Sequence, residues 1–457
     1  GDIVGYLKWD PSADHGLMLA ASGSDSELGD RLLPRYEHSA PSEPRDRTDG
    51  RTRRLEVGYH RRFGPGNDLL MHASRLDLEL DQRSVLELCT PGVTAVCDQF
   101  NPPPQDWEQW ADLALEQPYT PLQGAWLRRH DAHGLVLGAA WYDGEQELLA
   151  AFDNLVGPPY NQVLPVVVTP PGRERDRRSL SLWLHDLWRP RPGLLVHAGL
   201  HYESMDNRDV DLQRGLAATQ LRDAEVDVDA LAPRLGLAWQ VTAQDTLRVA
   251  AFRALLPYLS DRLDPADVAG IPVHRNGSAG ALTDELQLAW ERSWSRGFAA
   301  VVAWAFERER EKEIEGVGTE KDEIDGHGAQ LTGELLLGHG VGLALHYAYR
   351  DYNDDPESDL SRADQLATAR LTWVDPRGFG ARLEQVWRHI DFDTARATEE
   401  LWSTDVELSY EFPGKRGRVA LEVENLFDEQ FDWFTDPFDT DGRIPARQAR
   451  LVLTLNL

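Results

Sequence analysis

"TDVELSYEF" (residues 404–412) places apolar and polar side chains in strict alternation. One face of this stretch carries Val406, Leu408, Tyr410 and Phe412, and the other carries Glu407, Ser409 and Glu411. A period of two is typical of a β-strand that has one apolar face and one wet face. The stretch therefore predicts a sheet rather than a helical body.

The same alternation recurs along the chain, for example in "VGLALHYAYR" (residues 341–350) and "RVALEVENL" (residues 418–426). The last segment sets Leu451, Leu453, Leu455 and Leu457 against Arg450, Val452, Thr454 and Asn456. We expect about 19 strands, near residues 2–10, 16–24, 54–63, 68–80, 120–131, 134–152, 177–189, 194–206, 231–241, 246–256, 282–294, 297–309, 327–338, 340–352, 364–375, 379–391, 399–412, 416–427 and 446–457.

The connections between these strands alternate between short and long. Tight turns rich in Gly, Pro and Asp occur in segments such as 187–196 and 373–383. Long polar connections are expected at residues 25–53, 84–119, 153–176, 207–229, 257–282, 309–326 and 431–445. The proline-rich segment 154–172 is interpreted as a loop.

Short turns at one end and long loops at the other are typical of outer-membrane barrels, whose strands alternate apolar-out and polar-in. No segment offers the roughly 20 apolar residues that a membrane helix needs. Because backbone groups in lipid must all be paired, the sheet is expected to close. The sequence thus predicts a large closed antiparallel transmembrane β-barrel of about 20 or 22 strands, with short periplasmic turns and long extracellular loops. Since an odd count cannot close antiparallel, we expect an upstream piece to be missing or one strand to be miscounted.

The net charge of the chain is −30, and 27% of its residues are charged. Such an excess of carboxylates repels phosphate, so nucleic acid is excluded as a partner. The charge is interpreted either as an aid to solubility or an adaptation to a salty habitat, or as acidic loops or an acidic lumen that attract cations.

Cys89 and Cys97 are the only cysteines, in "CTPGVTAVC". No histidine lies near them in the sequence to complete a metal site. We predict a small disulfide-closed loop, which requires an oxidising compartment such as the periplasm or the cell surface. The chain opens on Gly1 without a signal peptide, which we interpret as a processed product or a fragment.

Two segments resemble TonB-dependent outer-membrane receptors. Residues 231–259, with the run Pro-Arg-Leu-Gly-Leu-Ala, resemble a mid-barrel hairpin of these receptors. Residues 419–434 and 442–457 resemble their closing strands, in which an Asn-Leu-Phe-Asp motif (residues 425–428) follows the penultimate strand. The segment "LDPADVAGIPVHRNGSAG" (residues 263–280) is similar to a subgroup in which the barrel is fused to helical repeats.

The resemblance implies an outer-membrane receptor that imports a scarce solute and contacts lipid and the TonB complex. We find no copy of the plug domain or of the TonB-binding box, so residues 1–457 are expected to be the barrel alone, lacking an upstream plug or repeat region. One alternative is a structural or export barrel of a larger envelope assembly, joined to periplasmic helical repeats or other subunits. Another is a secreted β-protein.

Several loop residues are candidates for ligand or metal binding. Trp107, Trp110 and Tyr119 lie in a segment expected to be an extracellular loop with a short helix, and Tyr258 opens another loop. We interpret them as ligand-binding residues, although packing over the barrel mouth also explains the first three. Two acidic loops offer oxygen ligands for calcium: Asp354, Asp355, Glu357 and Asp359 in the first, and Asp436, Asp439 and Asp441 in the second.

No catalytic motif is present. The chain has no Gly-x-Ser-x-Gly elbow, no His-Glu-x-x-His pair and no glycine-rich phosphate loop. His185, His197, His346 and His389 are scattered through predicted strands and are interpreted as lumen or interface residues rather than metal ligands. The sequence therefore predicts no enzyme and no required cofactor, with calcium as the one candidate ion.

Overall fold

The structure is a computed structural model of the 457-residue chain. It describes residues 2–28, 47–89, 107–156, 162–168, 174–214, 219–257, 263–273, 279–314, 316–354, 362–392, 399–429 and 447–455. No helix in these ranges is long and apolar enough to cross a membrane.

Strands make up nearly all of the described chain. They are β1 (Asp2–Ser12), β2 (His15–Leu28), β3 (Arg47–Gly64), β4 (Asn67–Cys89), β5 (Trp107–His130), β6 (His133–Val156), β7 (Gln162–Val168), β8 (Glu174–Arg191), β9 (Leu194–Arg214), β10 (Thr219–Gln240), β11 (Asp245–Leu255), β12 (Asp267–Val268), β13 (Ile271–Pro272), β14 (Leu282–Trp294), β15 (Gly297–Ile314), β16 (Gly318–Gly338), β17 (Val341–Asp354), β18 (Arg362–Val374), β19 (Phe379–Phe392), β20 (Glu399–Glu411), β21 (Gly417–Glu424) and β22 (Gln448–Leu455). A 3-10 turn, η2 (Pro413–Lys415), joins β20 to β21.

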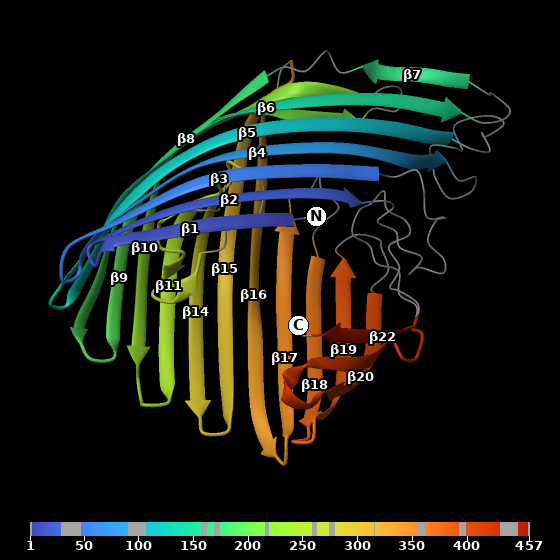
Figure 1. The fold of residues 1–457 in the computed structure, drawn as a ribbon. Coiled ribbons are helices and arrows are strands. Elements are labelled where there is room, and N and C mark those ends of the chain that lie inside the picture. The colour runs from blue at the N-terminus through green and yellow to red at the C-terminus, as the bar shows by residue number, and fades with distance from the viewer. Residues whose placement is uncertain are drawn as a thin grey trace.

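Twenty of these strands form one antiparallel sheet. The sheet curves around an interior, and the small hairpin β12–β13 lies inside that curve (Figure 1). Each long strand pairs with the next one along the chain, as in a meander, while the short β7 adds only to the end of β6. Leaving out β7, the wall has 19 long strands, which matches the number predicted from alternation.

The two faces of the wall differ as the alternation predicts. On β20 and β21, Leu408 and Leu421 are directly paired and are 54% and 43% exposed on the outside. Their neighbour Glu407, on the opposite face, is only 8% exposed because it lies among inner side chains. The exposed large side chains at mid-height on the outside are apolar, for example Leu184, Leu286 and Leu371. The outside of the wall therefore suits hydrocarbon.

Aromatic side chains mark both edges of this apolar band. On β19, Trp387 and Phe379 lie eight residues apart, and on β20 Trp402 and Tyr410 repeat the spacing. Trp387 pairs with Trp402 and Phe379 with Tyr410, so the rings of neighbouring strands lie at the same heights. These are the two aromatic girdles that a transmembrane barrel places at the membrane interfaces.

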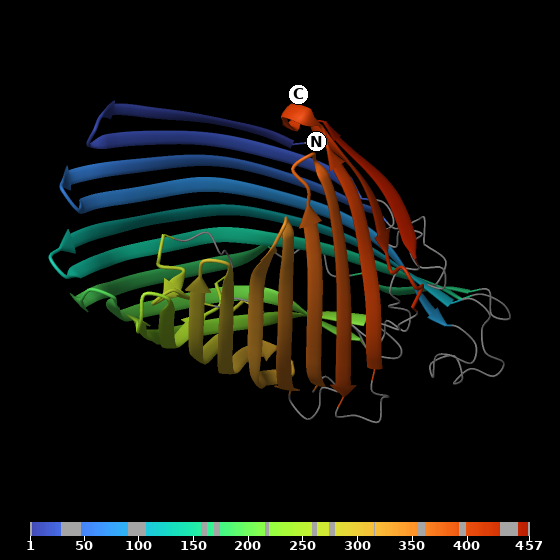
Figure 2. The same cartoon turned by 90° about the horizontal axis from the view of Figure 1, so that it is seen from below.

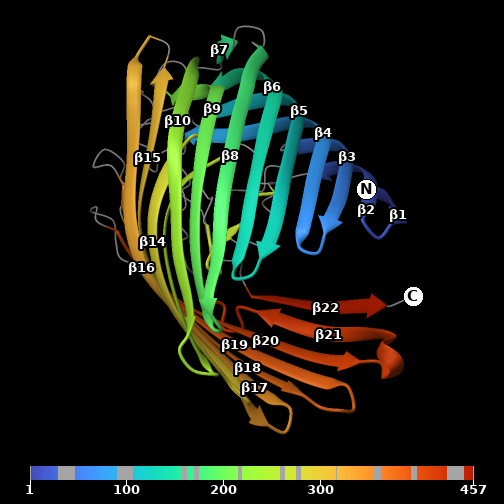
Figure 3. The same cartoon turned by 90° about the vertical axis from the view of Figure 1, so that its left-hand side faces the viewer.

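The first and last strands form the two edges of the sheet. In the described chain, β1 pairs with β2 alone and β22 with β21 alone. Both edges come to the same side of the molecule (Figures 2 and 3). Each edge strand runs toward the short turns, so the two are parallel to one another. Two parallel strands cannot pair with each other in an antiparallel ladder. Antiparallel closure of the sheet would need an odd number of further strands between β22 and β1, and the 19 described strands show no β1–β22 pairing.

Several predicted loops are strands, and these predictions are wrong. β4 continues to Cys89 and β5 starts at Trp107, so Trp107 and Trp110 lie in a strand rather than in a loop with a short helix. The proline-rich segment also contains β7, which pairs with β6. Beyond the bilayer both faces of a strand meet water, so alternation disappears from the sequence while the backbone ladder continues.

Candidate functional site

The interior of the wall is lined by charged side chains arranged in pairs. Across β18 and β19, the Arg370 guanidinium lies 2.6 Å from Glu384. Across the next strands, Glu407 lies between Arg382, at 3.5 Å, and Arg418. Opposite charges on neighbouring inner positions neutralise one another, so this part of the lumen is polar without a strong field of either sign.

A second group of inner residues is buried on β5, β6, β8 and β9. Tyr119, Arg177 and Asn207 lie in one row across the sheet, because Tyr119 pairs with Gly144, Gly144 with Arg177, and Arg177 with Asn207. Their exposed fractions are 3%, 1% and 1%. We call these three residues and Tyr142, which lies beside them, the polar row.

Gly144 allows the polar row to pack. A Cβ on this residue would lie 2.7 Å from the Tyr119 ring and 3.1 Å from the Tyr142 hydroxyl. The Tyr119 and Tyr142 rings are 5.5 Å apart between centroids. Any larger side chain at this position would therefore displace one of the two tyrosines.

The polar row has hydrogen-bonding capacity that the described residues leave unused. Neither the amide nitrogen nor the amide oxygen of Asn207 has a hydrogen-bond partner among them. One level further toward the long loops, the buried Gln146 pairs with Arg175, and its side-chain oxygen also has no such partner. Buried polar groups are normally hydrogen-bonded, so a ligand or ordered water is expected here.

A segment of the chain crosses the interior and packs on the wall. Residues 263–273, which contain the β12–β13 hairpin, are here called the strap. The backbone N–H of Leu263 donates to Gln123 of β5 (2.8 Å), and Arg234 of β10 donates to the carbonyl of Pro265 (3.1 Å). Arg248 of β11 donates to the carbonyl of Ala269 (2.9 Å). Side chains from several inner strands thus fix the strap.

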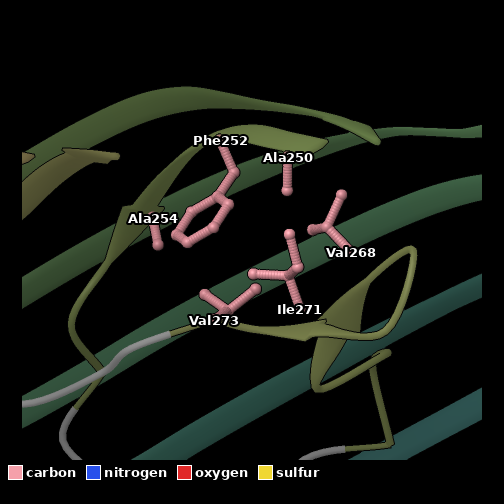
Figure 4. Close-up of a cluster of buried hydrophobic side chains, with 6 residues drawn as sticks. All are labelled: Ala250, Phe252, Ala254, Val268, Ile271 and Val273. Atoms are coloured by element: carbon pink, nitrogen blue, oxygen red, sulfur yellow. The ribbon is translucent and has the colours of Figure 1, made fainter. Parts of the chain in front are cut away.

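The strap also shares an apolar core with β11, as Figure 4 shows. The buried residues of this core are Ala250, Phe252 and Ala254 from β11 and Val268, Ile271 and Val273 from the strap. Burying the Phe252 ring and the three branched side chains contributes about 1.5–3 kcal/mol for each. The strap is therefore a packed part of the interior.

The comparisons with known proteins agree with this architecture. Residues 1–308 match the family described as "TonB dependent receptor-like, beta-barrel". The chain belongs to the TonB-dependent receptor family. It is therefore an outer-membrane β-barrel with a transport or receptor role.

Solved structures of receptors share the fold of this receptor barrel. The ferric-catecholate import receptor Fiu from E. coli K12 is 10% identical with a TM-score of 0.66, covering 100% of this chain and 74% of Fiu. The ferric yersiniabactin uptake receptor FyuA from Yersinia pestis is 10% identical with a TM-score of 0.69, covering 100% and 71%. The siderophore receptor PiuA from Acinetobacter baumannii is 12% identical with a TM-score of 0.67, covering 99% and 74%. No curated protein sequence matches the chain.

The motif that carried the family resemblance has a structural role in this receptor barrel. Asn425 and Asp428 both have positive φ, of 48° and 60°, at the end of β21. The Asn425 amide donates to the carbonyl of Glu429 and accepts from its N–H, each at 2.9 Å. Asp428 accepts from the N–H of Arg447 at 2.8 Å. The motif thus closes a turn and brings the chain back toward β22.

The structure brings only one of the predicted ligand residues, Tyr119, into the polar row. Trp107 and Trp110 lie in β5 above it, but their side chains lie outside what the structure describes, and so does Tyr258. Sequence reasoning missed Arg177 and Asn207. Arg177 begins a predicted strand, but Asn207 falls at the start of a predicted loop (residues 207–229), so the alternation gave no signal that pairs them.

The disulfide and calcium predictions fall outside the described residues. Cys89 ends β4 without a described side chain, and Cys97 lies in an undescribed segment. Of the predicted calcium ligands, Asp354 ends β17 without a described side chain; Asp355, Glu357, Asp359, Asp436, Asp439 and Asp441 are not described. Within the described ranges, no group of three or more His, Cys, Asp or Glu side chains is arranged to hold a metal. Both predictions stay predictions.

Proposed function

We propose that this receptor barrel imports an anionic metal chelate and that the polar row is part of the surface that binds it. The supporting observation is the position of Arg177, a buried guanidinium between Tyr119 and Asn207 on the inner wall. Guanidinium groups recognise carboxylates and other oxyanions through charge-assisted hydrogen bonds. Arg175 lies one inner position away on the same strand and adds to the positive potential.

The negative charge of the rest of the chain makes the two buried arginines, Arg175 and Arg177, distinctive. With a net charge of −30, the molecule as a whole repels anions. Adjacent buried arginines therefore mark a place where an anion is locally favoured. Among the similar receptors of known structure, Fiu is an import receptor for ferric catecholate, FyuA an uptake receptor for ferric yersiniabactin and PiuA a siderophore receptor.

The binding test measures the affinity of the refolded chain for ferric chelates by intrinsic tryptophan fluorescence. We expect Arg177→Gln to weaken binding at least tenfold, since charge-assisted hydrogen bonds contribute about 1.5–3 kcal/mol. Asn207→Asp, which keeps the volume but adds a negative charge beside Arg177, should also weaken binding. Arg370→Gln is the matched control, because Arg370 lies on the inner wall in a separate ion pair.

Heat-modifiable migration on a gel verifies that each variant is a folded barrel. Unchanged affinity in both folded polar-row variants would contradict the proposed site. Energised import is tested separately by uptake in cells with and without TonB. Uptake that continues without TonB would contradict an import role driven by the TonB complex, and no uptake in either strain would favour a structural or export barrel.

A further inference from the structure

Three buried histidines on the inner wall lie in hydrogen-bonding contact beneath the tip of the strap. His185 is on β8 and His197 and His201 are on β9, and each is at most 1% exposed. His185 Nδ1 lies 2.7 Å from His197 Nε2, and His185 Nε2 lies 2.7 Å from His201 Nε2. A Cβ on Gly199 would lie 2.4 Å from His185 Nδ1, so glycine is needed at that position for the rings to meet.

Both ends of this chain of rings have fixed partners. At one end, the backbone N–H of Ala269, at the strap tip, donates to His197 Nδ1 at 3.1 Å. At the other end, His201 Nδ1 lies 3.4 Å from the Glu203 carboxylate, which also accepts from the Ser181 hydroxyl. We call His197, His185, His201 and Glu203 the relay.

These partners determine where every proton of the neutral relay must lie. Because an N–H group can only donate, His197 Nδ1 must be an acceptor, and its proton therefore sits on Nε2. His197 then donates to His185 Nδ1, His185 donates from Nε2 to His201 Nε2, and His201 donates from Nδ1 to Glu203. Each contact holds one proton, so the three neutral rings satisfy the relay completely.

One added proton on any ring breaks this pattern. A doubly protonated imidazole only donates, so it places two donors at one of the contacts. Reversing the tautomers of the other rings moves the conflict along the relay toward Ala269. The wall contacts are held by the continuous backbone ladder of β8 and β9, whereas the Ala269 contact is held by the strap, which is fixed by a few side-chain hydrogen bonds and one apolar core. Separation at Ala269 is therefore the least costly way to relieve the conflict.

We propose that the relay is a proton-sensitive latch that fastens the strap to the barrel wall at neutral pH and releases it on acidification. With the strap fastened, the rings are neutral and shielded from water. With the strap released, they meet water and bind protons at the ordinary histidine pKa of about 6.5. Acid therefore favours the released state by linkage.

Charged side chains from each element that packs on the relay influence the equilibrium between the fastened and the released strap. Arg234 faces the relay from β10, Asp264 and Asp267 from the strap and Glu203 from β9, while Asp186 of β8 acts on it from the outer face, where it bonds His133. Arg234 also pairs with Asp264 at 3.5 Å. Releasing the strap separates this pair and exposes Arg234 and the rings to water, which screens the guanidinium charge, while Glu203 stays beside His201.

The geometry does not suit a metal ion shared by the three rings. His185 uses its two nitrogens toward different neighbours, so the three rings do not converge on one point. Consistent with this, no metal-binding group of His, Cys, Asp or Glu is found among the residues with described positions.

The test is hydrogen–deuterium exchange of the backbone of residues 263–273 in the whole refolded chain, corrected for the intrinsic pH dependence of exchange. Between pH 7.5 and pH 5.0 we expect protection of the strap to fall more than about 30-fold, the factor for one ring freed to its ordinary pKa. In the double variant His197→Asn/His201→Gln, which keeps hydrogen-bonding groups but removes two titrating rings, only His185 can still titrate, so the fall should be smaller than in the wild type and no more than about 30-fold.

Arg248→Gln is the matched control, since it removes another contact to Ala269 and leaves the relay intact. It should lower protection at both pH values and preserve their ratio. Protection in the wild type that does not change with pH, or an equal fall in the double variant, would overturn the latch. So would protection that rises on adding Zn²⁺ at pH 7.5 in the wild type but not in the double variant. Heat-modifiable migration confirms that all variants are folded.

Discussion

Glycine at position 236 determines how closely the strap approaches the wall. A Cβ there would lie 2.7 Å from a methyl of Val268 and 2.8 Å from the Cβ of Ala269. The strap tip is itself tightly defined, because Ala269 has a φ of 55°, in the left-handed region that few side chains adopt. Contacts on its N–H and its carbonyl hold it in that conformation.

We therefore expect Gly236→Ala to loosen the strap and cost about 1–3 kcal/mol, as overpacking of a fitted site does. Thermal unfolding in detergent and hydrogen exchange of residues 263–273 measure the effect. Gly333→Ala is the control, since a Cβ at that position meets nothing within 4 Å. Equal stability of the two variants would show that the strap is not fitted against β10.

Asp68 lies outside the apolar band, at the end of the wall that carries the short turns, and its carboxyl makes the stability of the fold depend on pH. His60 Nε2 lies 2.8 Å from its carboxylate and Arg62 Nε donates to it at 3.2 Å. The hydrogen bond from His60 lowers the pKa of Asp68, while partial burial opposes the shift and Arg62 adds to it. A carboxyl whose pKa is lower in the folded state stabilises the fold above its unfolded value of about 3.9.

Asp68→Asn should therefore reduce stability at neutral pH by about 1 kcal/mol or less, because the pairs are partly exposed. As the pH falls below about 4 this stabilisation is lost progressively, and the difference should disappear below the lowered pKa of the folded carboxyl. Urea titrations of both proteins between pH 7 and pH 3 measure this. A difference that stays constant to pH 3 would rule out the ionised carboxylate as its source.

At the scale of the strands, one face in contact with hydrocarbon explains both the sequence pattern and the pairing. Outer positions such as Leu182 and Leu184 on β8 are 44% and 52% exposed, yet they are apolar. The inner neighbours Trp183 and His185 on the same strand are nearly fully buried. Each strand therefore has one face toward lipid and one toward the lumen, which its own sequence specifies. Its backbone hydrogen bonds, by contrast, depend on both neighbouring strands.

Leu184→Arg tests the outer face. An arginine near the middle of the apolar band costs about 2–4 kcal/mol in a barrel, so we expect a large loss of folding yield in lipid vesicles. Val317→Arg is the matched control, since Val317 is similarly exposed, at 55%, but lies in the turn between β15 and β16 beyond the band. Similar yields for the two variants would place β8 outside the bilayer.

At the scale of the whole molecule, the girdles set the height of the band. Eight residues between girdles correspond to about 26 Å along a strand, and a tilt of 35–45° reduces this to about 20 Å. The wall is therefore built for a thin membrane. Mismatch with a thicker bilayer costs fractions of a kcal/mol per ångström.

We accordingly expect the folding yield to be higher in vesicles of 12-carbon acyl chains than in vesicles of 18-carbon chains. Heat-modifiable migration quantifies the folded fraction in each. The reverse order would mean that the hydrocarbon boundaries lie outside the two rows of aromatic rings.

The sequence by itself determined the wall. Alternation predicted 19 long strands, and most predicted boundaries lie within a few residues of those in the structure. The prediction succeeds because lipid on one side and a wet lumen on the other impose a period of two on each strand separately. It failed at the loop-side ends of several strands, at residues 47–53, 84–89, 107–119, 162–168, 207–214, 219–229, 310–314 and 318–326, where both faces meet water and no period is imposed.

Only the tertiary structure decided what lies inside the wall. Tyr119, Arg177 and Asn207 meet because of the register across four strands, which local sequence does not encode. The strap returns into the lumen because inner side chains of distant strands capture its backbone, and the three histidines meet because Gly199 leaves room for a ring. The polarity of each side chain is a local property that can be taken directly from the sequence. Contact between distant residues depends on how the whole sheet curves, so it cannot be predicted from local sequence.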